Sequence, residues 1–396
     1  MHPPSQPSLQ LTYCLNINPG ESWDEQFRAI REQAVRVRRA VAPAAAFGLG
    51  LRLGHDAVLT LARPNALAVF REWMADHGMY VATVNGFPYG RFHGTKVKDR
   101  VYAPDWRTVE RRDYTVRLAH VLAGLIPAGG TASISTVPVS FRPWIRSTAE
   151  AGEAVARLVE CAVELAQIER EHHRTIQLAL EPEPGCYLER TEEVVTFFND
   201  QLFRAGREEV ARAFLSTPAE AEALLRRHVG VCLDTCHAAV LFESPLDALR
   251  RLAGEGIGVF KVQLSAALGA RNSAAARAAL AAFAEPTYLH QTATRGGAFW
   301  PDLPDALAEL AGGFADEDVR VHFHVPLFWE GDGVLGSTAA ELTAPFFDAL
   351  RSGGPRTLEI ETYTFNVLPP DRRPADMSES LIREFRWVLD RFAAKA

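Results

Sequence analysis

Short apolar runs of seven to nine residues alternate along the chain with longer segments in which apolar residues recur every three or four positions. The short runs are typical of buried strands, and the longer segments, clearest over residues 150–172, are typical of amphipathic helices. Regular alternation of the two predicts a parallel sheet covered by helices. Nine runs are candidate strands: residues 11–17, 47–53, 79–86, 132–140, 176–183, 229–236, 258–265, 319–327 and 357–364.

Nine candidate strands are one more than the eight of a (β/α)8 TIM barrel, so we expect such a barrel with insertions. Such a barrel takes about 250 residues, and insertions extend it well beyond that. The chain has 396 residues, of which 47% are hydrophobic and 23% charged, so one decorated barrel accounts for it. We expect residues 1–10 to form a disordered lead and residues 11–396 a single barrel domain, with an insertion over 268–318.

Several late runs carry polar residues at every second position. Because successive side chains of a strand point to opposite faces, each run has one apolar face and one polar face. The polar faces would point into the barrel, towards the strand ends where active sites of such barrels are built. The alternative, an antiparallel sandwich with one face in water, is disfavoured by the helices in between. The polar sets are Gln177, Glu181 and Glu183; Cys232 and Asp234; Lys261, Gln263 and Ser265; His322 and His324; Glu359 and Glu361.

Carboxylates that converge on one barrel axis need a partner. A buried carboxylate is costly unless it is paired or bound to a metal, and clustered carboxylates repel one another and raise each other's pKa. A divalent cation resolves both costs. Carboxylate, imidazole and amide ligands suit Mn²⁺, Mg²⁺, Co²⁺ or Zn²⁺, so the ligand types do not identify which of these cations is bound.

Charge, cysteines and hydropathy narrow the class of protein. The net charge of −7 argues against extended nucleic-acid or anionic-membrane surfaces. No apolar run reaches the ~18–20 residues of a membrane span, and the N-terminal residues lack the pattern of a signal peptide. Five scattered cysteines form no disulfide framework, so we expect a cytoplasmic protein. Cys232 and Cys236 could begin a zinc–thiolate site, but a buried structural role fits them better because no second pair closes the site.

Three short motifs, ALEPEP, LDTCH and LEIET, resemble the xylose isomerase-like TIM barrels, a superfamily of sugar isomerases and epimerases, inosose dehydratases and AP endonucleases. That family places Glu at the end of strand five, Asp-x-x-His at strand six, His on strand seven and Glu at strand eight. Longer segments resemble the EboE-type family of metabolite traffic proteins. These segments are LTYCLNINPGESW, TVNGFPYGRFHGTKVKDRVYAPDW, ERRDYT and LEIETYTFNVLP.

The resemblance implies a ligand set. Glu181, Asp234 and a glutamate of the last strand would hold the metal, and Glu361 is preferred to Glu359 because it lies nearer the strand end. His237 would hold substrate or a metal-bound water.

The seventh strand departs from the family pattern, because Gln263 stands where a histidine ligand is expected. His290 or His324 would then supply the imidazole, and His322 is a further candidate that we assign to substrate contact. Asn85 and His93, in a basic and aromatic segment after a strand, with Lys261 and Gln263, are the other expected substrate contacts. An ordinary solvated loop is the alternative for the segment around His93.

The resemblance implies a metal-dependent isomerase or epimerase acting on a small polyol, a sugar-like compound or a secondary-metabolite precursor. Glu181 and Glu361 would pass a proton next to a carbonyl group. The activity would be associated with metabolite export or biosynthesis, and other proteins of the same operon are candidate partners. The main alternative is a non-catalytic protein that binds and hands over a metabolite in the same cleft. We expect no nucleic-acid partner and no membrane insertion.

Overall fold

A computed structural model describes residues 1–3, 6–94, 96–353 and 356–393 of the chain. Eight strands form one sheet in the order β1-β13-β7-β6-β5-β4-β3-β2, and every strand pairing within it is parallel. The strands are β1 (Gln10–Tyr13), β2 (Phe47–Arg52), β3 (Met79–Asn85), β4 (Thr131–Thr136), β5 (Thr175–Leu180), β6 (Val229–Asp234), β7 (Val259–Leu264) and β13 (Thr357–Ile360).

The two edge strands meet and nearly close the sheet into a barrel. Cys14 and Gly50 form a parallel bridge between the ends of β1 and β2, and the Thr12 hydroxyl donates to the carbonyl of Gly48 at 2.7 Å. A Cβ on Gly50 would lie 1.7 Å from Oε1 of Glu359, so only glycine leaves room for this buried carboxylate. The predicted (β/α)8 barrel with insertions is confirmed.

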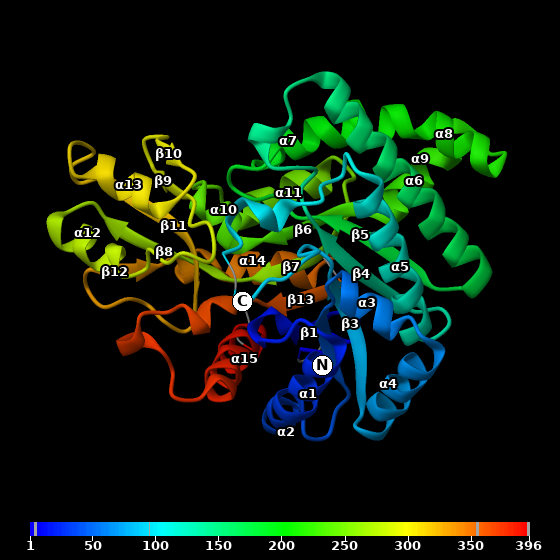
Figure 1. Cartoon of the computed structure of the whole chain (residues 1–396), viewed down its shortest axis with the longest axis horizontal. Helices are drawn as coiled ribbons and strands as arrows, with labels where there is room; N and C mark the ends of the chain where they lie inside the picture. Colours follow the sequence, from blue (N-terminus) through cyan, green and yellow to red (C-terminus); the bar gives the residue numbers. More distant parts are fainter. Residues whose placement is uncertain (4–5, 95, 354–355, 394–396) are drawn as a thin grey trace.

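Helices surround the parallel strands (Figure 1). The helix expected over 150–172 is α6, which begins after a Ser147 side chain that accepts from the backbone of Glu150 and ends at a left-handed His173. The helices outside the inserted segment are α1 (Trp23–Ala29), α2 (Val35–Val41), α3 (His55–Leu61), α4 (Pro64–Asp76), α5 (Val109–Leu125), α6 (Thr148–His172), α7 (Thr191–Thr196), α8 (Arg204–Phe214), α9 (Pro218–His228), α10 (Thr235–Val240), α11 (Pro245–Gly254), α14 (Ala344–Arg351) and α15 (Met377–Ala393).

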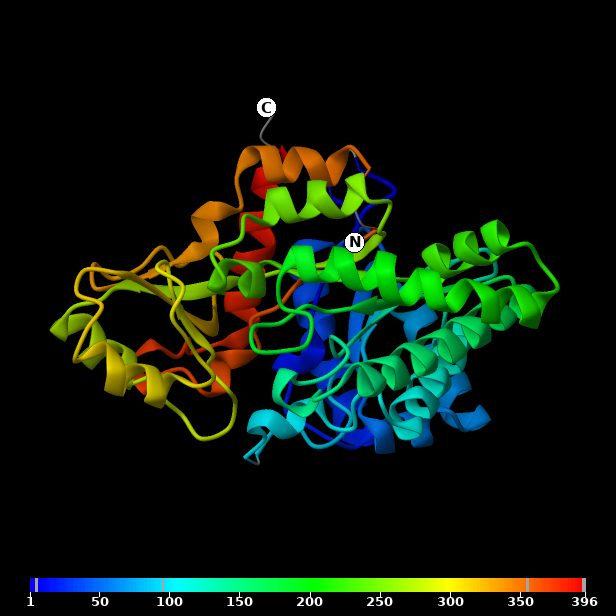
Figure 2. The ribbon, with the colours of Figure 1, turned by 90° about the horizontal axis from the view of Figure 1, so that it is seen from above.

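The segment between β7 and α14 forms a second, antiparallel sheet in the order β10-β9-β11-β8-β12. It lies to one side of the barrel (Figures 1 and 2). This insertion is longer than the 268–318 expected. Its elements are β8 (Ala266–Arg271), α12 (Ala274–Ala281), β9 (Thr292–Thr294), β10 (Phe299–Trp300), α13 (Leu303–Leu310), β11 (Asp318–Val325) and β12 (Leu335–Ser337).

The candidate strand 319–327, the one in excess of eight, therefore belongs to the inserted sheet and not to the barrel. It became β11, which pairs antiparallel with β8 and β9. Its alternating polar and apolar residues match those of a barrel strand, because both have two chemically different faces.

The N-terminal residues have contacts where a disordered lead was expected. The backbone of Met1 pairs with that of Leu11 in both directions, at 2.9 and 2.7 Å, and the side chains of Met1 and Leu9 are buried. Residues 4 and 5 of the expected lead lie outside the described residues. Burial of these two apolar side chains accounts for the packing.

The five cysteines are buried and free. Across the described residues, no helix is both long enough and apolar enough to span a bilayer.

Candidate metal centre

Three carboxylates meet at the C-terminal ends of barrel strands. Glu181 follows β5, Asp234 ends β6 and Glu361 follows β13, and each offers an oxygen within 4.8 Å of the others. We call these three residues the carboxylate triad. All three are buried, with at most 5% of any residue exposed. The structure thus brings together the carboxylates that the family pattern implies as ligands.

Two oxygens of the triad lack partners. Oδ1 of Asp234 is fully engaged, because it accepts from the backbone of Cys236 and His237 and from the Ser265 hydroxyl at 2.5 Å. Its other oxygen, Oδ2, and Oε2 of Glu181 are buried without a hydrogen-bond partner among the described residues. Buried polar atoms of this kind call for an unseen partner, and oxygen ligands in this number suit a divalent cation.

Burial and mutual repulsion shift the pKa values of the three carboxyl groups. Burial raises the pKa of Glu181 to about 8. Burial, reinforced by the charges of Glu181 and Asp234, also holds the pKa of Glu361 well above its usual range. Asp234 behaves oppositely: burial alone would raise its pKa, but the charges of His237 and His324 and the Ser265 hydrogen bond lower it overall. A bound cation would favour the ionised form of all three.

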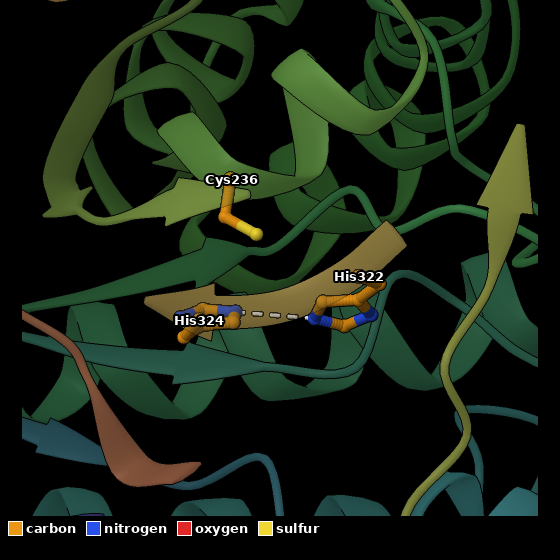
Figure 3. Close-up of side chains that lie close together, drawn as sticks. All are labelled: Cys236, His322 and His324. Carbon is orange, nitrogen blue, oxygen red and sulfur yellow. Dashed lines mark hydrogen bonds between the residues drawn. The ribbon is translucent and has the colours of Figure 1, made fainter. Parts of the chain in front are cut away.

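Three imidazoles lie beside the carboxylate triad. His237 comes from α10. His322 and His324 come from β11 of the inserted sheet (Figure 3). The Nε2 atom of His322 lies 3.1 Å from Nε2 of each of the other two. We call these residues the imidazole triad. Oδ2 of Asp234 lies 3.7 Å from Nε2 of His237 and 3.9 Å from Nε2 of His324, which joins the two triads.

Each ring of the imidazole triad is held through its other nitrogen. A metal-binding histidine commonly donates its second ring N–H to an oxygen, which orients the ring and leaves the coordinating nitrogen bare. In this protein Nδ1 of all three rings faces an oxygen in this way. The acceptors for Nδ1 of His237, His322 and His324 are, in order, the carbonyl of Pro182 at 2.9 Å, Oε1 of Gln291 at 2.7 Å and the carbonyl of Glu361 at 2.9 Å.

The three rings differ in their affinity for protons. Burial and the charges of the other two histidines hold the pKa of His322 well below its usual range, and mainly burial lowers the pKa of His324 to about 4. For His237, burial is outweighed by the charge of Asp234, so its pKa is raised. Cys236 faces His322 and His324 from α10 (Figure 3), with potential ligand atoms within 4.8 Å of one another. Burial holds the pKa of its thiol well above the usual range.

A pocket of about 560 Å³, counting its open mouth, leads to the triads. Its floor is polar and its walls are aromatic, which combines orienting contacts with apolar surface as in small-molecule sites. The segment after β3, expected to cover the barrel mouth, supplies much of one wall. The polar lining includes Asn16, Asn85, Lys98, Glu181, Glu183, His237, Gln263, His322 and Glu361, and the aromatic lining is Phe87, Phe92, Tyr102, Tyr288 and Tyr363.

Lys261, expected at the substrate, lies fully buried in the barrel interior. Its Nζ is 2.6 Å from Oε2 of Glu359 and 2.8 Å from Oδ1 of Asn85, and Asn85 also donates to Glu359 at 3.0 Å. Burial would lower the pKa of Lys261, but the charge of Glu359 raises it overall. Glu359 therefore serves as the partner of a lysine, whereas Glu361 reaches the pocket, as preferred from the strand ends. Asn85 and Gln263 do line the pocket.

The structure does not bring His290 or His93 to the triads. Both ring nitrogens of His290 are engaged: Nδ1 with the carbonyl of His322 at 2.9 Å and Nε2 with Oε1 of Glu285 at 3.0 Å. His93 is likewise held, with Nε2 2.7 Å from the carbonyl of Asn16 and its backbone bound to Glu21. The ring nitrogens of His290 and His93 already make hydrogen bonds elsewhere, which is why these two residues do not join the triads. The sequence alone does not show such hydrogen bonds.

Sequence reasoning passed over part of the site. Glu183 shares a strand face with Glu181, and this alternation was the available signal. In the structure Glu183 accepts from the Tyr102 hydroxyl at 2.7 Å and from Nε2 of Gln291 at 3.1 Å, and burial raises its pKa. Gln291 thereby connects Glu183 with His322. Tyr102 ends a short 3-10 helix (Lys98–Tyr102) and Gln291 lies in a loop, and no pattern in the sequence marked them.

No protein-family model and no curated protein matches the chain. Several solved structures do, including three that are each 12% identical to this chain. A D-tagatose 3-epimerase-like protein matches over 98% of this chain and 100% of its own, with a TM-score of 0.49. The IOLI protein with a binding zinc atom matches over 97% and 98%, with a TM-score of 0.47. A xylose isomerase domain protein from Alicyclobacillus acidocaldarius subsp. acidocaldarius matches over 97% of each chain, with a TM-score of 0.46. These likenesses concern the fold alone.

Proposed function

We propose that this chain is a metal-dependent isomerase or epimerase that acts on a small metabolite carrying a carbonyl group and neighbouring hydroxyl groups. The observation that carries the proposal is the carboxylate triad: three buried carboxylates within 4.8 Å of one another, two of them with an unpartnered oxygen. Two of them, Glu181 and Glu361, line the pocket.

The carboxylate triad would hold the cation, which would polarise the carbonyl oxygen of a bound substrate. Glu181 and Glu361 would move the proton next to that carbonyl group. A bound cation would keep both carboxylates ionised, and an ionised carboxylate beside the substrate can accept a proton as a general base. Asn16 donates to Oε1 of Glu361 at 3.2 Å and so orients that carboxylate.

The substrate class follows from the lining and from the sequence resemblance. Amide and imidazole groups on the floor, from Asn85, Gln263 and His322, suit hydroxyl and carbonyl oxygens, and the aromatic wall suits a ring or an apolar chain. Resemblance to the EboE-type family favours a secondary-metabolite precursor, handled together with other proteins of the same operon. Sugar-like and polyol compounds remain in the test panel because the resemblance to sugar isomerases favours them.

The experiment is hydrogen exchange with solvent. The full chain is stripped with a chelator, reloaded with Mn²⁺, Mg²⁺, Co²⁺ or Zn²⁺, and incubated in D₂O with a panel of ketoses, polyols and operon-derived intermediates. Deuterium incorporation at the carbon next to the carbonyl is followed by NMR. We expect exchange only after reloading, and a loss of about 10²–10⁴-fold in Glu181→Gln and in Glu361→Gln.

Glu110→Gln is the matched control, since Glu110 is an exposed glutamate of α5 and should leave the rate unchanged. Equal rates in the parent and both triad variants would contradict the proposal. Tight binding of a panel compound with metal present but without exchange would instead identify the chain as a metabolite carrier.

A further inference from the structure

We propose that the chain binds a small aromatic anion in a second pocket, between the barrel and the inserted sheet. The pocket measures about 1000 Å³ counting its open mouth, at the upper end of the range of small-molecule sites. Its lining residues come from the segments 141–143, 185–190 and 241–242 of the barrel and 291–301 of the insertion. None of them lines the pocket at the carboxylate triad, so the inference does not depend on the proposed isomerase activity.

Three aromatic rings line this second pocket. Phe141 lies in the loop after β4, Phe242 in the loop after α10, and Phe299 in β10. Phe299 is 38% exposed, which leaves much of its ring without protein contacts. A Cβ on Gly185 would lie 3.3 Å from the ring of Phe299 and 3.7 Å from that of Phe141, so glycine keeps the space beside both rings open. Exposed ring faces of this kind suit a flat, apolar ligand.

The backbone of Phe242 is held in a left-handed conformation, with φ at +59°. Glycine is usual at such a position after a helix, because a side chain makes the conformation unfavourable. The ring of Phe242 lies against two guanidinium groups, with its centroid 4.8 Å from Cζ of Arg295 and 4.2 Å from Cζ of Arg320. Backbone strain of this kind clusters at ligand sites. The strain therefore supports a binding role for this wall of the pocket.

The lining of the second pocket carries a surplus of positive charge. Arg142, Arg190 and Arg295 line it, against the single carboxylate of Glu189. The chain as a whole has a net charge of −7, so the sign of the charge is reversed at this place. A cluster of one sign around a cavity attracts ligands of the opposite sign. The lining therefore favours an anion.

Two of these arginines have N–H groups available for a ligand. Among the described residues, Arg190 forms no ion pair, and its guanidinium donates to the carbonyl of Leu241 at 3.2 Å. Arg295 uses its Nε for Asp318, at 2.9 Å. The remaining N–H groups can hold an oxyanion, which the planar guanidinium binds in a forked geometry. Rings and guanidinium groups together point to a ligand with both an aromatic ring and an anionic group.

The two pockets share a wall, which decides the choice of probe. Tyr102 of the first pocket stacks on Phe141 of the second, with ring centroids 5.1 Å apart. Gln291 lines the second pocket and also holds His322 at the first. An anion that binds divalent cations would confuse the two sites. The probe is therefore 1-naphthalenesulfonate, because a sulfonate is a poor ligand for such cations.

The test measures binding of this probe to the full chain by isothermal titration calorimetry. We expect one probe per chain, with the same affinity before and after reloading with Zn²⁺. Neutral 1-naphthol and inorganic sulfate should each bind at least about tenfold more weakly, since each offers only one half of the interaction. Equal binding of 1-naphthol would overturn the proposal, because the pocket would then not select an anion.

Two variants locate the bound probe. Arg190→Gln and Phe299→Ala should each weaken binding by about tenfold. Both side chains are exposed, so the fold should be retained, and the melting temperature checks this. Arg212→Gln is the matched control, because Arg212 is an exposed arginine of α8 outside the pocket lining, and its affinity should equal that of the parent. Absence of binding in the parent, or parental affinity in both pocket variants, would overturn the proposal.

Discussion

Removal of metal should make the stability of the fold fall as pH rises from 5 to 7, with Glu181 as a main cause. Burial raises the pKa of this carboxyl from its ordinary value of 4.5 to about 8 in the metal-free fold. Between these two values the native state keeps the proton and the unfolded chain releases it. The unfolded state then binds fewer protons, so the free energy of unfolding decreases with increasing pH.

The magnitude follows from the width of that window. One pH unit corresponds to about 1.4 kcal/mol per proton, so two units correspond to about 3 kcal/mol. With an unfolding entropy of ~2.1 cal/mol/K per residue, a chain of 396 residues has about 0.8 kcal/mol/K. The melting temperature of the metal-free protein should therefore fall by about 3–4 °C between pH 5 and pH 7 through Glu181 alone.

Glu181→Gln isolates this contribution, because glutamine has a similar shape and does not titrate. Melting temperatures of chelator-treated parent and variant are compared at pH 5 and pH 7 at equal ionic strength. The parent should lose about 3–4 °C more than the variant. In the metal-loaded parent the difference should vanish, because a bound cation keeps the carboxylate ionised in the native state. Parallel pH profiles of metal-free parent and variant would refute the reasoning.

Two further predictions concern the barrel interior. Gly50→Ala should destabilise the protein by about 3 kcal/mol or more, because the new Cβ would collide with Glu359; denaturant unfolding measures the loss. Gly90→Ala is the control: its new Cβ would have no atom within 4 Å, so the free energy of unfolding should change by less than about 0.5 kcal/mol. Lys261→Met should cost about 3–5 kcal/mol by leaving Glu359 buried without its partner, and adding Glu359→Gln should recover most of that loss. An unchanged unfolding midpoint in Lys261→Met alone would show that the ion pair is not needed.

The barrel strands were accessible to sequence analysis because strands buried on both faces are nearly continuous apolar runs. Residues 258–265, for example, contain β7, Val259–Leu264. The inserted sheet was not accessible in the same way. Its strand β8, with sequence AALGAR, is rich in alanine and glycine, which favour strands weakly. Alternation in β11 showed that the strand has two different faces but not which sheet it joins.

The candidate site, like the fold, could be predicted from the sequence only in part. Glu181, Asp234 and Glu361 stand directly at strand ends, so the topology alone predicts their convergence. The sequence could not show which imidazoles are free to bind. His290 and His324 are equally plausible ligands from the sequence. In the structure, however, the ring of His290 is held by Glu285, whereas the ring of His324 faces Asp234. Such competition for ring nitrogens is set by tertiary contacts.

The origin of His322 and His324 on β11 couples the metal centre to the docking of two sheets. The inserted sheet is tied to the barrel at this point, since Nδ1 of His324 contacts the carbonyl of Glu361 and the Thr364 hydroxyl donates to the carbonyl of His324. A cation shared between Asp234 of the barrel and imidazoles of the insertion would act as a cross-link between the sheets. Any movement that separates the sheets would weaken cation binding, and cation binding would oppose that movement by the same free energy.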